Sequence, residues 1–154
     1  MAADLKGRSG LITGAGSGIG RAAALIMARA GANVVVADVN DAGGAETVAA
    51  IKAAGGEARF VRTDVADPEA VEALVAQTVA AYGRLDWAFN NAGIAGPIAA
   101  TADYPLEAWH KVIDINLNGV WYGLRAQIQQ MLKQGGGSIV NTASDAGLVG
   151  LRGA

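Results

Sequence analysis

The sequence contains no cysteine, which excludes a disulfide framework, a thiolate nucleophile and a cysteine-ligated metal site. It has no excess of positive charge either. Twelve lysines and arginines, scattered singly, stand against 14 acidic residues, for a formal net charge of −2. A weakly acidic chain gives no electrostatic reason to bind nucleic acid or an anionic membrane. We therefore expect no metal site, no nucleic-acid partner and no membrane partner.

Long apolar runs are also missing. No segment approaches the ~20 consecutive apolar residues that a membrane-spanning helix needs. The start, Met1–Lys6, lacks the apolar core of a signal peptide. Internal repeats, linkers and low-complexity segments are absent as well. With 154 residues, 52% of them hydrophobic, the chain is expected to form one cytoplasmic domain, residues 1–154, around a sheet buried on both faces.

The most informative stretch is residues 11–20, Leu-Ile-Thr-Gly-Ala-Gly-Ser-Gly-Ile-Gly. A short apolar run enters it and an alanine-rich helical pattern leaves it, so the glycines lie at a strand-to-helix turn. Glycine has no Cβ to hold a ligand away, and a helix N-terminus presents unpaired N–H groups that bind phosphate. The spacing Thr-Gly-x-x-x-Gly-x-Gly therefore predicts a dinucleotide site. A tight strand–helix connection without a ligand is the alternative.

Strand and helix patterns alternate along the rest of the chain. After the run at 11–12, strands are expected at 33–38, 58–63, 85–89 and 138–142. Helices are expected at 21–30, 41–54, from Asp67-Pro68 to Gly83, and over a long segment at about 106–134. This order predicts an α/β fold, a doubly wound parallel sheet of the Rossmann type. The long helix carries an apolar stripe that keeps helical spacing throughout, formed by Ile113, Leu117, Val120, Leu124, Ile128 and Met131.

Asp38 ends the second strand, where an acidic residue of a dinucleotide fold accepts hydrogen bonds from the ribose hydroxyls. The same carboxylate repels a 2′-phosphate. Ser17 and Asn40, the neighbouring polar residues, are neutral and offer a 2′-phosphate no cation. The pattern thus favours NAD over NADP. The alternative is that Asp38 caps the following helix.

Taken together, these motifs resemble the short-chain dehydrogenase/reductase family, in order and spacing, from about residue 5 to the end. The matching segments are Thr13-Gly14 with Gly18-Ile19-Gly20, Asp64-Val65, Asn90-Asn91-Ala92-Gly93, Asn116 in Ile-Asn-Leu-Asn-Gly-Val, and Ser144 in Ile-Val-Asn-Thr-Ala-Ser. The resemblance implies that the pyrophosphate is cradled by Gly14, Ser17, Gly18, Ile19 and Gly20. It implies that Asp64 and Val65 meet the adenine and that Asn91, Ala92 and Gly93 line the cofactor cleft.

Two catalytic roles follow from the same resemblance. Asn116 would hold a water for proton relay, and Ser144 would hydrogen-bond the substrate carbonyl or hydroxyl. Taken singly, Asn116 could be a satisfied polar kink and Ser144 a turn residue. The implied activity is NAD(P)-dependent hydride transfer between nicotinamide and a secondary alcohol or ketone. A homo-oligomer is implied for the complete protein.

One departure from the family pattern concerns its general acid–base pair, a tyrosine followed four residues later by a lysine. Tyr82, Tyr104 and Tyr122 are followed at that spacing by Asp86, Ala108 and Ala126. The chain is therefore expected to be the N-terminal, cofactor-binding portion of such an enzyme. It would hold five strands, lack the C-terminal ones and be inactive alone. The alternative is a non-catalytic nucleotide-binding or interaction module.

Overall fold

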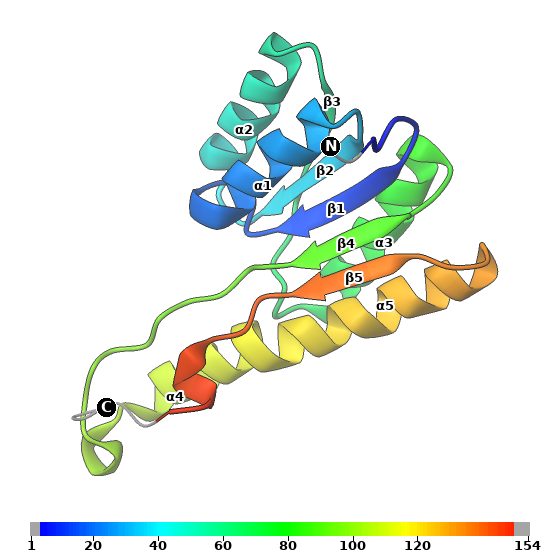
Figure 1. Cartoon of the computed structure of the whole chain (residues 1–154). Helices are drawn as coiled ribbons and strands as arrows, with labels where there is room; N and C mark the ends of the chain where they lie inside the picture. Colours follow the sequence, from blue (N-terminus) through cyan, green and yellow to red (C-terminus); the bar gives the residue numbers. More distant parts are fainter. Residues whose placement is uncertain (1–3, 150–154) are drawn as a thin grey trace.

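A computed structural model of the chain describes residues 4–149, which form a five-stranded sheet with helices on both faces (Figure 1). All paired strands are parallel, in the order β3-β2-β1-β4-β5. The strands are β1 (Ser9–Thr13), β2 (Asn33–Asp38), β3 (Glu57–Arg62), β4 (Trp87–Asn90) and β5 (Ser138–Asn141). The helices are α1 (Gly18–Arg29), α2 (Asp41–Ala53), α3 (Pro68–Tyr82), α4 (Leu106–Ile113) and α5 (Gly119–Lys133). The predicted fold class is confirmed.

The sheet is buried on both faces over its central strands, which explains the uninterrupted apolar run in β2. Val34 and Val36 pack with α1 and α2, whereas Val35 faces the α3 and α5 side. Because successive side chains of a strand point to opposite faces, a strand covered by helices on both sides has no polar face. The start of α3 also follows its sequence signal: Asp67 accepts a hydrogen bond from the backbone N–H of Glu69, and Pro68 occupies the first turn.

The predicted long helix is present but is not uniform. A π-helical segment, Asp114–Asn118, joins α4 to α5. The apolar stripe is only partly buried: Met131 is 5% exposed, whereas Leu117 is 60% exposed and Ile128 is 46% exposed. The buried residues of α5 are Gly119, Gly123, Ala126, Gln127 and Met131. A Cβ on Gly119 would lie 2.9 Å from Val65 Cγ2, so the close approach of this helix to the protein interior requires small residues.

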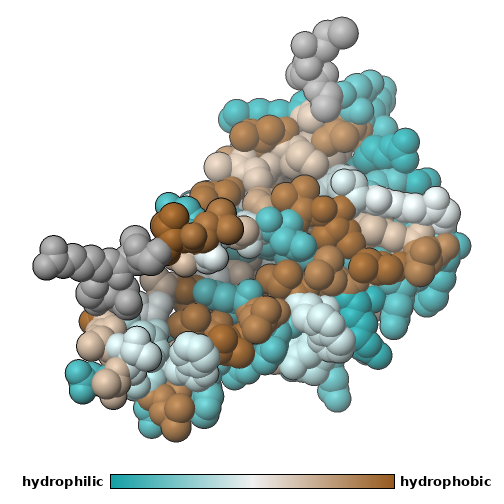
Figure 2. Space-filling view, turned by 60° about the horizontal axis from the view of Figure 1, so that its bottom comes forward, coloured by the Kyte–Doolittle hydropathy of each residue, from teal (hydrophilic) through white to brown (hydrophobic). Residues whose placement is uncertain are grey.

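The side of the molecule that carries α5 and β5 exposes apolar side chains (Figure 2). Over residues 4–149, β5 is the last strand of the sheet and has one paired edge. Val140 on this strand is 57% exposed, and Trp121 on α5 is 58% exposed. A strand edge that carries no lysine or proline, beside exposed apolar residues, favours pairing with another chain.

We therefore expect the isolated 154-residue chain to self-associate. Sedimentation velocity over a concentration series should show species larger than the monomer. The substitution Val140→Lys should shift the distribution toward monomer, since a charge on an edge strand opposes pairing. A compact monomer at every concentration would contradict the prediction.

Candidate functional site

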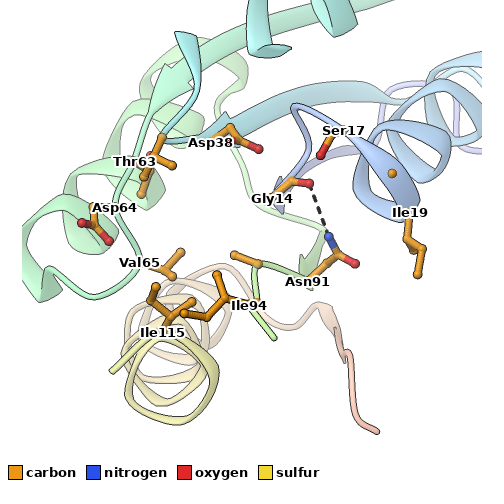
Figure 3. A pocket seen from close by; sticks show the side chains of 14 residues that line it. Gly14, Ser17, Ile19, Asp38, Thr63, Asp64, Val65, Asn91, Ile94 and Ile115 are labelled. Atoms are coloured by element: carbon orange, nitrogen blue, oxygen red, sulfur yellow. Dashed lines mark hydrogen bonds between the residues drawn. The ribbon is translucent and has the colours of Figure 1, made fainter. Parts of the chain in front are cut away.

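A cavity of about 500 Å³ opens at the carboxyl ends of the strands (Figure 3). Its wall is built by the segments that follow β1, β2, β3 and β4. The π-helical segment Asp114–Asn118, which precedes α5, closes one side. The lining residues are Gly14, Ser17, Gly18, Ile19, Asp38, Val39, Thr63, Asp64, Val65, Asn91, Ala92, Gly93, Ile94 and Ile115. The cavity lies where the strand order reverses, between β1 and β4, which is the position of ligand sites in open α/β sheets.

The structure brings ten of the eleven predicted cofactor residues to this cavity. The exception is Gly20, which is buried behind the glycine-rich loop. A Cβ at Gly20 would overlap the backbone oxygen of Gly14. Gly14 and Gly18 themselves have positive φ angles of 65° and 51°. These three glycines shape the loop by backbone conformation and close packing.

The N-terminus of α1 differs from those of α2 and α3. Ser17 is the N-cap residue of α1, but its side chain accepts no hydrogen bond, and the first turn holds no acidic residue. By contrast, Asn40 caps α2 and Asp67 caps α3, and each of those first turns contains an acid. The first turn of α1 therefore presents its N–H groups and positive dipole end to the cavity with no side-chain cap and no acid of its own. This arrangement fits a phosphate group.

Asp38 lines the same cavity beside the glycine-rich loop (Figure 3). Its Oδ2 accepts a hydrogen bond of 2.7 Å from the Gly16 N–H, and its Oδ1 accepts one of 2.9 Å from the Asn40 N–H. The N-cap of α2 is Asn40, whose side chain accepts from the Gly43 N–H at 3.0 Å. The carboxylate of Asp38 is therefore not the helix cap. It is half-buried on the cavity wall, able to accept from further donors there.

Two arginines near Asp38 were missed by the sequence reasoning. Arg62, opposite Asp38 in the strand register, donates to the Val39 carbonyl oxygen and to Asp41. Arg21 donates to the carbonyl oxygen of Gly16 and to Glu46. Cations therefore do lie in this region, although each is engaged by an acid and a backbone carbonyl. Arg21 directly follows Gly20 of the motif, but its contact with Glu46 spans 25 positions. Arg62 reaches Asp38 only through the strand register, so the spacing of the motif could reveal neither contact.

Hydrogen bonds between the end of β1 and the segment after β4 hold the inner wall of the cavity in place. The Thr13 hydroxyl oxygen accepts hydrogen bonds from the backbone N–H groups of Asn91 and Ala92, both at 3.0 Å. In return, Asn91 Nδ2 donates to the Thr13 carbonyl oxygen at 3.0 Å and, more weakly, toward Gly14 (Figure 3). The buried Thr13 is thus a further site residue. It locks the Asn91–Gly93 wall to the glycine-rich loop.

The two predicted catalytic residues lie outside the set that lines the cavity. The Asn116 amide is engaged on both sides by Ile94: Oδ1 accepts from its N–H and Nδ2 donates to its carbonyl oxygen, both at 2.9 Å. Ser144 is exposed, and its Oγ accepts from the Ala146 N–H at 3.2 Å. The polar-kink and turn roles are therefore what these side chains perform here. Their catalytic roles stay predictions.

Over residues 4–149, no helix is both long and apolar enough to cross a membrane, and no cluster of potential metal ligands is found. Comparison with known proteins shows that the model of the short chain dehydrogenase family matches residues 9–154. The chain belongs to this family. Short-chain dehydrogenase membership, the five-stranded Rossmann sheet and the cavity at its switch point agree with one another.

Relatives of the chain are named as dehydrogenases. It is 46% identical over 142 residues to the cyclohexanol dehydrogenase of Acinetobacter sp. (strain SE19), covering 92% of this chain and 57% of the relative. It is 49% identical over 149 residues to a 2,5-dichloro-2,5-cyclohexadiene-1,4-diol dehydrogenase of Sphingobium indicum (strain UT26), covering 96% and 58%. The structure of NAD⁺-bound xylitol dehydrogenase matches with a TM-score of 0.93 and 39% identity, covering 97% and 57%. The chain therefore spans little more than half the length of these relatives.

Proposed function

We propose that this chain is the cofactor-binding part of an oxidoreductase that prefers NAD to NADP and acts on a secondary alcohol or ketone. The observation that carries the proposal is one cavity with an uncapped helix N-terminus on one wall and a carboxylate on another. The first suits a diphosphate and the second a ribose diol. The names of the relatives, which range from cyclohexanol dehydrogenase to xylitol dehydrogenase, support a secondary alcohol as the substrate class.

In this proposal the residues of the chain bind and orient the cofactor. The α1 N-terminus and the glycine-rich loop hold the diphosphate, Asp38 accepts from the ribose hydroxyls, and Asp64 with Val65 lies against the adenine. The nicotinamide of bound NAD supplies the hydride chemistry. Asn91, Ala92 and Gly93 form the wall toward β4. Ser144 hydrogen-bonds the substrate oxygen. Asn116, whose side-chain amide bonds Ile94, holds a water for proton relay. A homo-oligomer is proposed for the complete protein.

The substitution Ser17→Asp separates phosphate binding from folding. Aspartate at an N-cap accepts from the free N–H groups and interacts favourably with the helix dipole, so it should leave stability unchanged or raise it by about 0.3–1 kcal/mol. The same charge should repel a bound diphosphate and weaken NADH binding at least about tenfold. Calorimetric titration with NADH and a thermal melt measure the two effects.

Ser17→Asn is the matched control, because it caps equally well but carries no charge. It should keep NADH affinity within about twofold of that of the original chain. A chain that binds no NADH at all would overturn the proposed function. Equal affinities for the Asp and Asn variants would show that the diphosphate does not lie at the α1 N-terminus.

A further inference from the structure

A group of three side-chain amides, two buried and one exposed, joins α5, β4 and β5. Gln127 Nε2 donates to Asn90 Oδ1 at 2.7 Å, and Asn90 Nδ2 donates to Gln127 Oε1 at 3.0 Å. Asn90 Nδ2 also donates to Asn141 Oδ1 at 2.9 Å. Gln127 is 1% exposed and Asn90 is 3% exposed. We call Gln127, Asn90 and Asn141 the amide triad.

Room for the triad is provided by Gly123, one turn before Gln127 on α5. A Cβ at this position would lie 2.7 Å from Asn90 Oδ1. Two buried amides that satisfy each other must meet in one geometry, because any displacement leaves donors and acceptors without water or protein partners. The triad is therefore sensitive to how the three elements are aligned.

Apolar packing alone does little to align β5. The strand has four residues and pairs on one side, with β4. Ile139 packs against the core on the α5 side, whereas Val140 is 57% exposed on the other face. A slip of one residue would exchange these two similar side chains between the faces, at little cost in buried apolar area. The same slip would carry Asn141 to the face away from α5, and Asn90 would lose it as a partner.

We infer that the amide triad sets the register of β5 against β4, with Gln127 as the positioning residue. The register decides where the loop after β5 lies. Thr142 donates its backbone N–H to the Asn90 carbonyl oxygen at 2.9 Å, and its hydroxyl to Asn91 Oδ1 at 3.3 Å. Ser144 follows two residues later. The triad thus places the Ser144 loop against the Asn91–Gly93 wall of the cavity, and its link to the reaction rests on the proposed function.

Disulfide trapping tests the register directly, because the chain has no cysteine of its own. Phe89 and Val140 are register partners on the face away from α5. The double substitution Phe89→Cys/Val140→Cys should therefore cross-link readily on mild oxidation. Adding Gln127→Leu should lower the cross-linking rate by about fivefold or more, the factor that corresponds to one net hydrogen bond.

Two further variants serve as a control and as a second test. Gln129→Leu, at an exposed position of the same helix, should leave cross-linking unchanged. Asn141→Ala removes the exposed member of the triad and leaves the core intact, and it should also slow cross-linking. It therefore tests the inference even where Gln127→Leu does not fold. An unchanged rate in folded Gln127→Leu, or in Asn141→Ala where the former does not fold, would overturn the inference.

Ligand binding separates positioning from simple stability. ADP-ribose shares the Asp38 and diphosphate contacts proposed for NADH but has no nicotinamide. In folded Gln127→Leu, affinity for ADP-ribose should stay within about twofold while that for NADH falls about fivefold. Equal losses for both ligands would mean a purely structural role. If the original chain binds neither nucleotide, the proposed function fails, while the cross-linking result still decides the register.

Discussion

The 154-residue chain is expected to bind NADH yet to oxidise secondary alcohols at least about 10²-fold more slowly than a complete member of its family, because it lacks a general acid–base pair. Proton exchange with the substrate oxygen by a positioned side chain contributes about 10²–10⁴-fold to such reactions. Its loss also leaves the alkoxide uncompensated. Ser144 and Asn116 can orient a substrate, but neither titrates near neutral pH.

The three tyrosines cannot take over this role in the described structure. Tyr82 lies at the far end of the sheet from the cavity, where its hydroxyl donates to Glu57 at 3.0 Å, Glu57 being the first residue of β3. Burial, together with the Glu57 carboxylate, raises the pKa of Tyr82 to about 12, away from the range useful for acid–base catalysis. Tyr104 packs against Gly96, and Tyr122 packs against the core. None of the three lines the cavity.

The measurement is NADH formation with a panel of secondary alcohols, on protein whose mass has been confirmed. Clear turnover that Ser144→Ala abolishes would contradict the prediction and show that the chain is catalytically sufficient. NADH binding without turnover would agree both with a cofactor-binding portion of an enzyme and with a binding module. The coding sequence beyond residue 154 would separate those two, through the presence or absence of a Tyr-x-x-x-Lys segment.

Much of the fold could be predicted because its signals are local. The β-branched run at 33–38 matches β2 residue for residue, and the Asp67-Pro68 pair marks the start of α3. The cavity wall was predictable for a related reason. The carboxyl ends of parallel strands meet at one edge, so residues that follow β1, β2, β3 and β4 come together whatever their separation in the chain.

The remaining features depend on contacts between distant residues. Beside Ala126 and Met131, the buried face of α5 uses two glycines and a glutamine, whereas the large apolar Ile128 is 46% exposed. A hydrophobic pattern therefore identifies that face only in part. The pairing of Gln127 with Asn90 spans 37 positions and has no local signature. Arg62 approaches Asp38 through the strand register, and Ile94 takes up the Asn116 amide across 22 positions.

Removing the Asp38 carboxylate is expected to narrow the preference of the chain for NADH over NADPH. A charge-assisted hydrogen bond to a ribose hydroxyl is worth about 1.5–3 kcal/mol, so Asp38→Ala should weaken NADH binding about tenfold or more. The same substitution removes a negative charge that repels a 2′-phosphate, so affinity for NADPH should rise. Titration calorimetry with both cofactors measures the change, and equal affinities in the unsubstituted chain would refute the assignment of Asp38.

Asp38→Ala has a second consequence that must be separated from the first. The carboxylate also accepts from the Gly16 N–H, so its loss frees the glycine-rich loop. Asp38→Asn keeps an oxygen that can accept from Gly16 and from a ribose hydroxyl but carries no charge. It should therefore raise NADPH affinity as Asp38→Ala does, while losing less NADH affinity. The difference in NADH affinity between the two variants measures what the Asp38 oxygen contributes by supporting the loop and by bonding the ribose, separately from its charge.

The neighbouring ion pair supplies the control for charge alone. Asp41 engages Arg62 at 2.9 Å, and Arg62 also donates to the Val39 carbonyl on the cavity wall. Asp41→Asn removes one negative charge three residues from Asp38 and releases Arg62, yet leaves the Asp38 carboxylate in place. NADH affinity should stay within about twofold, since exposed ion pairs contribute little. NADPH should gain less than in Asp38→Asn, because a 2′-phosphate would still meet the Asp38 carboxylate; an equal gain would assign the discrimination to the net charge of the region.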